Sequence, residues 1–475
     1  MGCTDQCEKT GRNLIKVKRK QKESRERLLK SKKGEAGMGK WKRRLCISTV
    51  VAALITAALI YQCQNRKIIL EFGMFTGSNW EVASANSFKT IDKAINRFEE
   101  SHPNVKIHYY SGIAKEDYSE WCARKLLEGK MPDVFMILDS DFEKFTSLGV
   151  MKDLDEMMAR DSGFHKEDFF TTALNTGRRN GRQYALPYET VPTLMFVNKS
   201  LLAKERIQMP KEDWTWEDMY EICRKVTMDT DKDGLLDQFG TYNYSWRDAF
   251  YTSGGKLYDE NQDQFSFTDS RVLDAIKYIK RLNDLNQSQS VTQEDFNEGR
   301  VAFMPLTFAE YRTYKTYPYR IKKYTRFQWD CITFPAGKEG ENLSKVDALL
   351  IGINNKTKHD QLAWEFLKQL TYTEEMQMDV YLYSQGVPAL KSVASSKEGA
   401  NIIQEDMDEG EQVINSTLLY NVIEDGIIEP KHLQYQQVMN LADGEVSKIL
   451  QENKNVDSSM KIFQRNVSKY LQQQK

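Results

Sequence analysis

Side chains arranged for catalysis are scarce in this 475-residue sequence. It contains no nucleophile elbow, no H-E-x-x-H zinc motif, no phosphate-binding P-loop and no dinucleotide fingerprint. Paired carboxylates such as Asp139/Asp141 and Asp153/Asp155 are ordinary in a chain with 28% charged residues, where they serve as solvated surface or helix caps. The five histidines stand far apart, without the spacing of metal ligands: His102, His108, His165, His359 and His432. We therefore expect no enzymatic activity.

One acidic loop has the spacing of a metal site. Carboxylates alternate along residues 229–237, with Gly234 at the sixth position, and the four candidate ligands are Asp229, Asp231, Asp233 and Asp237. Calcium prefers several oxygen ligands, and glycine allows the sharp turn that such a loop needs. The twelfth position, where a glutamate would close the site, is Gly240. A weak calcium site stays open, but a metal-free turn is favoured, and no other cofactor is expected.

Two tryptophans stand beside polar side chains in positions that suit ligand contact. Asn79 and Trp80 end a Gly/Ser/Asn loop directly after the first expected strand. Ligands of open α/β sheets lie at the carboxyl ends of strands. An indole there offers a flat apolar face to a sugar ring, while an amide can bond hydroxyl groups. Trp246 and Arg247 offer the same mixture in the second half. Core packing is the alternative for both tryptophans.

The elements around these residues alternate between strand and helix. Apolar runs predict strands at 68–75, 105–110 and 134–138, and amphipathic patterns predict helices at 88–100 and 118–128. This alternation indicates an α/β architecture with right-handed crossovers. About 400 residues exceed what one core supports, so two lobes are expected. Further apolar runs at 184–197 and 346–353, without a Pro- or Gly/Ser-rich linker, predict extended strands that join the lobes as a hinge.

A single apolar segment divides the chain. Residues 45–61 are almost wholly apolar and follow the basic cluster at 40–44. This arrangement predicts insertion with the N-terminus in the cytoplasm and the remaining residues outside. Seventeen residues lie at the short end of a membrane span. An uncleaved anchor is favoured, and a cleaved signal or a lipid on Cys63 stays open. Gln62 stands where a lipobox needs a small residue.

Charge and cysteine usage agree with this sidedness. Residues 1–44 form a basic cytoplasmic or leader segment with 16 Lys+Arg against 5 Asp+Glu, and Met38 is an alternative start. Residues 45–475 hold 51 Lys+Arg against 63 Asp+Glu. Such an acidic outer domain argues against nucleic acid as a partner. Beyond Cys63 only Cys122, Cys223 and Cys331 remain, which we expect to be single buried thiols.

Ordered motifs along the outer region resemble one known family. They are LEFGMF at 70–75, FEESHPNVKI at 98–107, MPDVF at 131–135, GRQYALP at 181–187, FVNK at 196–199, WTWED at 214–218, FNEGRVAF at 296–303, IGI at 351–353 and AWEFL at 363–367. The chain thereby resembles extracellular solute-binding proteins of family 1, the maltose-binding-protein-like receptors of bacterial ABC importers. One departure is FAEY at 308–311, where the family usually shows Gly-x-Trp.

The resemblance implies a two-lobed, periplasmic-binding-protein-like α/β fold with a ligand cleft between the lobes. Three crossovers would fall near 186–193, 301–307 and 346–353. The N-lobe would comprise 68–187 and 308–347, and the C-lobe 188–302 and 353–475. Family contacts, carried over by position, imply a set of ligand-binding residues: Asn79, Trp80, Asp139, Tyr188, Glu189, Trp246, Arg247 and Tyr311.

The implied partners are a mono- to oligosaccharide ligand, the membrane subunits of an ABC permease and a separate ATPase. The implied place is the outer face of the cell membrane. Two other functions stay open. A membrane-tethered sugar-sensing module would need a signalling receptor as partner, and a glycoside hydrolase would need two cleft carboxylates about 5–10 Å apart.

Overall fold

The computed structural model describes residues 20, 22–23, 67–80, 87–259, 262–316, 327–405 and 415–474. The chain divides into two compact units, Met1–Ile68 and Ile69–Lys475. The apolar segment 45–61 and Cys63 lie outside the described residues. Among the described residues, no helix combines the length and the apolar character that a membrane span requires. The account below concerns the second unit.

The first elements alternate as the sequence predicts. They are β1 (Ile68–Gly73), α2 (Ser87–Ser101), β2 (Val105–Tyr109), α3 (Lys115–Leu127), β3 (Val134–Ile137) and α4 (Asp139–Ser147). β1 pairs in parallel with β3, with Phe72 opposite Val134. α2 buries the apolar face that its spacing predicted, which includes Ile91, Ala94 and Phe98. Parallel strands with helical crossovers place the carboxyl ends of β1 and β3 at one edge of the sheet.

One long strand organises the central sheet. Nine strands of the described residues form a mixed sheet in the order β2-β1-β3-β12-β6-β10-β7, with β11 and β13 also paired to β6. The first part of β6 (Ala185–Asn198) pairs with β12 (Val346–Ile353). Its second part pairs with β10 (Val301–Thr307) and β11 (Trp329–Ile332). These strands coincide with the apolar runs that the sequence offered as crossovers.

The remaining elements complete the α/β layers. Between β3 and β10 lie α5 (Asp155–Arg160), α6 (Thr171–Thr176), the hairpin β4–β5 (Arg178–Arg179 and Arg182–Gln183), α7 (Lys199–Lys204), α8 (Trp216–Val226), β7 (Phe239–Thr241), α9 (Trp246–Tyr251), the hairpin β8–β9 (Tyr258–Asp259 and Gln264–Phe265), α10 (Ser270–Asp284) and α11 (Gln293–Asn297). Later come α12 (Phe308–Thr316), α13 (Asp360–Thr371), α14 (Glu374–Tyr383), β13 (Val387–Pro388), α15 (Lys391–Ala394), α16 (Lys397–Glu405), α17 (Ser416–Glu424), α18 (Tyr435–Gln451) and α19 (Val456–Gln474).

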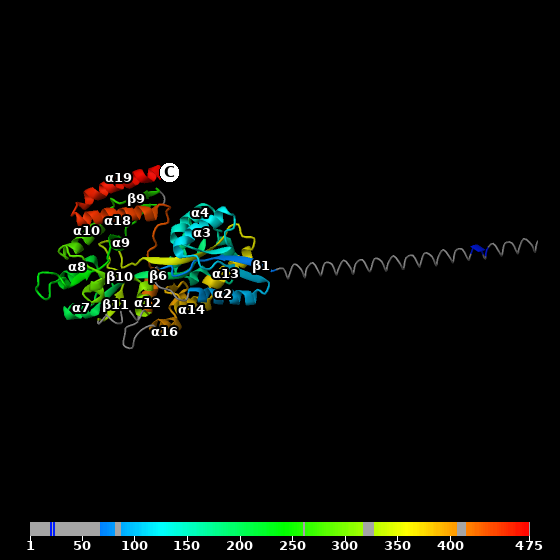
Figure 1. Ribbon diagram of the computed structural model, residues 1–475, viewed down its shortest axis with the longest axis horizontal. Helices are drawn as coiled ribbons and strands as arrows, with labels where there is room; N and C mark the ends of the chain where they lie inside the picture. The colour runs from blue at the N-terminus through cyan, green and yellow to red at the C-terminus, as the bar shows by residue number, and fades with distance from the viewer. Residues whose placement is uncertain are drawn as a thin grey trace, which may run out of the picture. The chain divides into compact units, whose positions relative to one another are not determined.

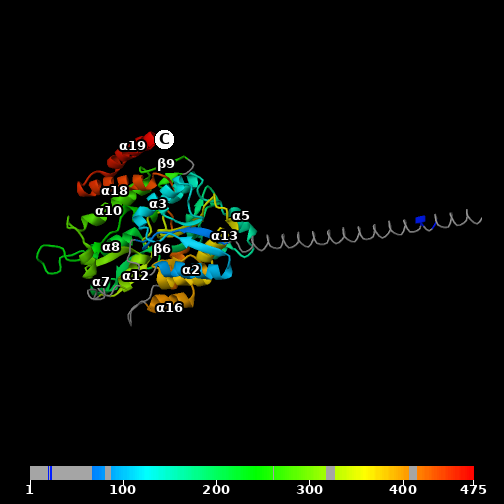
Figure 2. The ribbon, with the colours of Figure 1, turned by 45° about the vertical axis from the view of Figure 1, so that its right-hand side comes forward.

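The helices form two groups within this unit. Figures 1 and 2 show α2, α3 and α13 beside β1, whereas α8, α10, α18 and α19 gather at the other end of the sheet. The second group encloses one apolar core that includes Met219 on α8, Ile276 on α10 and Met439 on α18. α8 begins with a capping box, in which Thr215 and Asp218 exchange hydrogen bonds.

Two segments differ from the predicted division into lobes. Residues 353–475 were assigned to the C-lobe, but Phe366 of α13 packs on Phe72 of β1 and Phe98 of α2, with ring centroids 5.5 and 5.2 Å apart. Residues 308–347 were assigned to the N-lobe, but β11 pairs with residues 195–198 of β6, and the Trp214 indole donates to the Thr333 carbonyl at 3.0 Å. The cause is that β12, rather than β10, is the strand that pairs with both β3 and β6.

Cys122, Cys223 and Cys331 are buried and form no disulfide among the residues that the structure describes, as predicted. Burial raises the pKa of the Cys122 thiol to about 12 and that of Cys223 further still. Thiols in such surroundings are inert packing groups.

Candidate functional site

A cavity of about 280 Å³ lies where several strands and loops end. Asn79 and Trp80 reach it from the loop after β1, and Asp139 from the first turn of α4, directly after β3. The start of β12 and the segment between α17 and α18 close it. The full lining is Asn79, Trp80, Lys115, Leu138, Asp139, Ser140, Thr176, Val346, Asp347, Ala348, Ile428, Glu429 and Lys431. Three of the eight predicted ligand residues therefore meet in one cavity.

The Trp80 indole is held by a buried carboxylate. Its Nε1–H donates to Oε1 of Glu189 on β6 at 2.8 Å, and the Ser384 hydroxyl donates to the other oxygen. Glu189 is only 3% exposed, and burial raises the pKa of its carboxyl despite these donors. A Cβ on Gly386 would stand 2.7 Å from this carboxylate, so a larger residue there would have to displace it. Glu189 thus fixes the indole rather than lining the large cavity.

Charges at the cavity occur in compensated groups. Lys431 donates to Asp139. Lys345, immediately before β12, lies 3.2 Å from Asp347 and 3.1 Å from Glu429. Burial raises the pKa of the Asp347 carboxyl, with Lys345 opposing the rise. Burial alone would lower the pKa of Lys345, but the two carboxylates outweigh it and raise that pKa above its ordinary value.

Glu429 also connects the cavity to α9. The Tyr251 hydroxyl donates to its Oε1 at 2.5 Å, and an Arg247 guanidinium nitrogen lies 4.0 Å from the same oxygen. Arg247 additionally pairs with Asp443, which accepts the Trp246 indole N–H at 2.8 Å. Arg247 is therefore one residue removed from the cavity. Trp246 is buried in the core of the second helix group and does not line the cavity.

The two predicted tyrosines also lie away from the large cavity. Tyr188 is buried beside Glu189 and lines a smaller cavity of about 30 Å³ that Asn79 shares. Tyr311 is buried in α12, where it packs against Phe196 and Trp329 with ring centroids 5.5 and 5.7 Å apart.

Four charged lining residues escaped the sequence reasoning: Lys115, Asp347, Glu429 and Lys431. Asp347 carried a usable signal, because an aspartate inside the apolar run 346–353 needs a buried partner. Glu429 and Lys431 carried none. They stand in a charged segment and come near Asp139 only through the tertiary fold.

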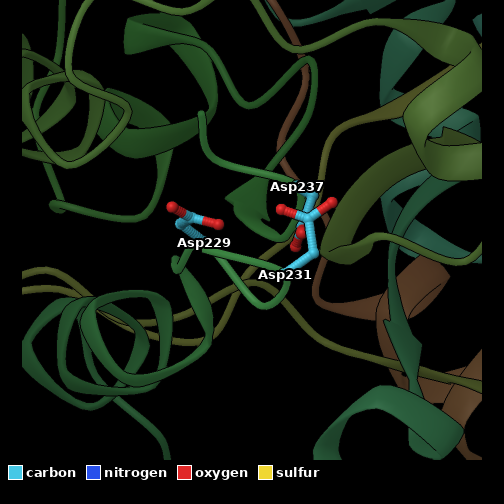
Figure 3. Close-up of side chains that lie close together, drawn as sticks. All are labelled: Asp229, Asp231 and Asp237. Carbon is cyan, nitrogen blue, oxygen red and sulfur yellow. The ribbon is translucent and has the colours of Figure 1, made fainter. Parts of the chain in front are cut away.

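Three carboxylates of the acidic loop lie close together. Oxygens of Asp229, Asp231 and Asp237 all fall within 4.8 Å of one another, as Figure 3 shows, whereas Asp233 is not part of this cluster. Asp229 accepts the N–H groups of Lys232 and Gly234 at 2.6 and 2.8 Å, and these bonds lower the pKa of its carboxyl. Backbone donors thus hold the turn by themselves. A weak calcium site therefore stays open, and a turn that needs no metal stays the favoured prediction.

A two-group α/β fold around a central sheet, with a polar cavity at the strand ends and an indole at its rim, defines the class of two-lobed solute receptors. The family model for bacterial extracellular solute-binding proteins matches residues 93–406. The chain belongs to that family, which confirms the resemblance read from its motifs.

Known relatives agree with this assignment. An uncharacterized lipoprotein from the oleD 5′ region of Streptomyces antibioticus is 21% identical over 350 residues, which are 67% of this chain and 72% of that protein. The sugar-binding protein MalE of Xanthomonas citri superposes with a TM-score of 0.70 at 14% identity, covering 86% of this chain and 98% of that one. An ABC substrate-binding protein of Listeria monocytogenes, solved in complex with cycloalternan, superposes with a TM-score of 0.63 at 18% identity, covering 85% of this chain and 99% of that one. The fold is that of two-lobed periplasmic binding proteins.

Proposed function

We propose that this protein is the substrate-binding component of an ABC importer and that it binds a neutral carbohydrate in the 280 Å³ cavity. The observation that carries the proposal is the Trp80 indole at the cavity, locked through its N–H by buried Glu189. A locked indole presents a fixed apolar face for a sugar ring at low entropic cost. Amide, carboxylate and ammonium groups around it supply hydrogen bonds for hydroxyls.

The pairing of charges favours a neutral ligand. Asp139 is matched by Lys431, and Lys345 sits between Asp347 and Glu429. Each of these groups still has lone pairs or N–H donors for hydroxyl groups. A charged ligand would instead have to compete with an existing partner for each of these groups. Mono- to oligosaccharides meet this requirement.

Importer function requires partners in the membrane. We propose that closure of the two lobes around the sugar creates the form that docks on the permease subunits, which a separate ATPase drives. Family membership supports this role, and the Listeria monocytogenes relative is described as an ABC substrate-binding protein. Residues 45–61, or a lipid on Cys63, would tether the protein to the outer face. The relative described as a lipoprotein supports a tether.

A thermal-shift screen of the full chain against a panel of sugars tests the binding proposal. A ligand at 100-fold above its dissociation constant should stabilise the folded state by about 2.7 kcal/mol. Trp80→Ala should abolish most of the shift. Trp216→Ala is the matched control, because Trp216 is also partly buried but lines a separate cavity.

Four outcomes would count against the proposal. If no carbohydrate shifts the melting transition, the ligand class is wrong. If Trp80→Ala binds like the parent protein, the indole is a packing group. If chromatography shows that the bound glycan is slowly cleaved, the protein is better explained as a glycoside hydrolase. If a strain that lacks the protein takes up the sugar at an unchanged rate, the sensing module is favoured.

A further inference from the structure

We propose that a surface at the amino ends of β1 and β3 rests on the anionic lipid bilayer. We call it the amino-end patch and define it by Ile69, Leu127, Leu148, Lys356 and Lys358. Its three aliphatic side chains are unusually accessible, with Leu127 90%, Leu148 69% and Ile69 58% exposed. The proposal rests on the proposed membrane tether, but it is independent of which ligand the cavity binds.

These side chains form one surface. Ile69, Leu148, Lys356 and Lys358 line a common hollow of about 240 Å³, and Leu127 follows Leu126 of the same lining. Single exposed aliphatic residues are normal on soluble proteins, but grouped ones mark a site of contact. The hollow floor adds further apolar side chains, namely Leu126, Met131 and Val150.

The charge at the rim of the patch is positive and available. Lys356 and Lys358 are exposed and form no ion pair with any carboxylate that the structure describes. Asp133, the carboxylate in the same lining, is already engaged by the Thr357 hydroxyl at 2.5 Å and the Glu71 N–H at 2.9 Å. Lysines near an anionic bilayer each favour binding by about fivefold.

The chain itself places this surface near a membrane. Six residues, 62–67, separate the apolar segment from β1, and Ile69 is the second residue of that strand. Six residues reach at most about 20 Å when fully extended. A lipid on Cys63 would leave four, which reach about 14 Å. Both forms of tether therefore hold the amino-end patch within reach of the bilayer.

The composition favours lipid over a protein partner. Protein interfaces are enriched in Tyr, Trp and Arg and depleted in Lys. The amino-end patch consists of three aliphatic side chains and two lysines, and the hollow beside them also holds Asp133, Asn354 and His359. Membrane-surface contacts use this combination, since aliphatic groups enter the interface while lysines pair with headgroups.

Contact at this end would orient the receptor. The amino-end patch lies at the amino ends of β1 and β3, whereas the ligand cavity lies at their carboxyl ends. Resting on the bilayer through the patch keeps the cavity turned away from the lipid and accessible to solute. In this orientation the receptor can bind solute before it docks on a permease.

Photo-crosslinking in a defined bilayer tests the proposal. The full chain is placed in nanodiscs of phosphatidylcholine and phosphatidylglycerol, two to one, that carry diazirine lipids, and crosslinked peptides are mapped by mass spectrometry. We expect crosslinks in residues 45–61 and, separately, in peptides that contain Leu127 and Leu148. Lys356→Glu/Lys358→Glu should reduce the patch crosslinks by about tenfold or more. The matched control is Lys448→Glu/Lys461→Glu on exposed positions of α18 and α19.

The outcomes separate this proposal from the proposed function. Crosslinks confined to residues 45–61 would overturn it, as would patch crosslinks that survive the lysine substitutions and high salt. If the patch gives no lipid crosslinks and instead becomes protected when permease subunits are added, the surface belongs to a protein partner. Sugar-induced thermal shifts of the same variants should equal those of the parent, and their loss would count against the binding proposal alone.

Discussion

The contact between Trp80 and Glu189 offers the sharpest test of how the site is built. Glu189→Gln keeps the shape and one acceptor oxygen but removes the charge. Trp80→Phe keeps an aromatic face but removes the N–H donor. Combined with the double variant, the two substitutions form a cycle that isolates the charge-assisted part of one hydrogen bond.

The magnitude follows from the geometry. The bond is 2.8 Å long and its acceptor is 3% exposed, so it belongs to the charge-assisted class worth about 1.5–3 kcal/mol. The neutral amide of Glu189→Gln retains about half of this hydrogen-bond free energy. The cycle should therefore give a coupling free energy of about 1 kcal/mol. Freeing the indole also costs affinity, because immobilising one side chain on binding takes about 0.5–1.5 kcal/mol, or roughly two- to tenfold in the dissociation constant.

Urea unfolding of the four proteins gives the coupling, and calorimetric titration with the sugar found by thermal shift gives the affinities. Because burial raises the pKa of Glu189, the folded state holds this proton at pH values where the unfolded state has lost it. The stability of the parent relative to Glu189→Gln should therefore fall as the pH rises above about 4.3. The reasoning would be refuted if the effects of the two single substitutions on the free energy of unfolding add up to that of the double variant within about 0.3 kcal/mol. It would also be refuted if the stability difference between the parent and Glu189→Gln does not depend on pH.

Three further predictions concern the surroundings of the site. Lys345→Met should cost about 1.5 kcal/mol in urea unfolding because it removes the cation that the half-buried Asp347 and Glu429 share; a loss under about 0.5 kcal/mol would mean a weak, solvent-screened pair. Iodoacetamide should modify Cys122 only on unfolding, since its pKa is about 12; peptide mass spectrometry showing rapid labelling of the native protein would contradict this. Calcium added to chelator-treated protein should leave the melting temperature unchanged, because backbone donors already hold Asp229; a rise would favour a calcium site.

Sequence reasoning succeeded where one local rule decided the outcome. The strand-end rule placed Asn79 and Trp80, and the family resemblance placed Asp139, among the residues that line the cavity. Trp246 was chosen for a similar mixture of neighbouring residues, and it lies in the core of the second helix group. The difference was readable, because Ser245 and Asp248 form a capping box that makes Trp246 the first residue of a helix, where it packs inward.

The order of the lobes could not be read from strand patterns alone. β10 and β12 are equally apolar runs, and only their partners distinguish them. β12 pairs with β3 as well as β6, whereas β10 pairs with β6 and β7. Strand pairing is a non-local property, set by which faces must be buried together, and no window of sequence encodes it. The segments that follow each strand were misassigned for this reason.

Several charged groups at and beside the cavity lie on segments that join the two helix groups. Glu189, which holds the Trp80 indole, lies on β6, Asp347 lies on β12, and Glu429 lies in the segment before α18, where Lys345 pairs with both Asp347 and Glu429. A ligand shifts a conformational equilibrium only through contacts that differ between the two states. Groups that lie deep inside one lobe would contact a sugar equally well whether the lobes are open or closed. Groups on connecting segments change their spacing as those segments bend, so the sugar contacts made there can convert binding into the proposed closure.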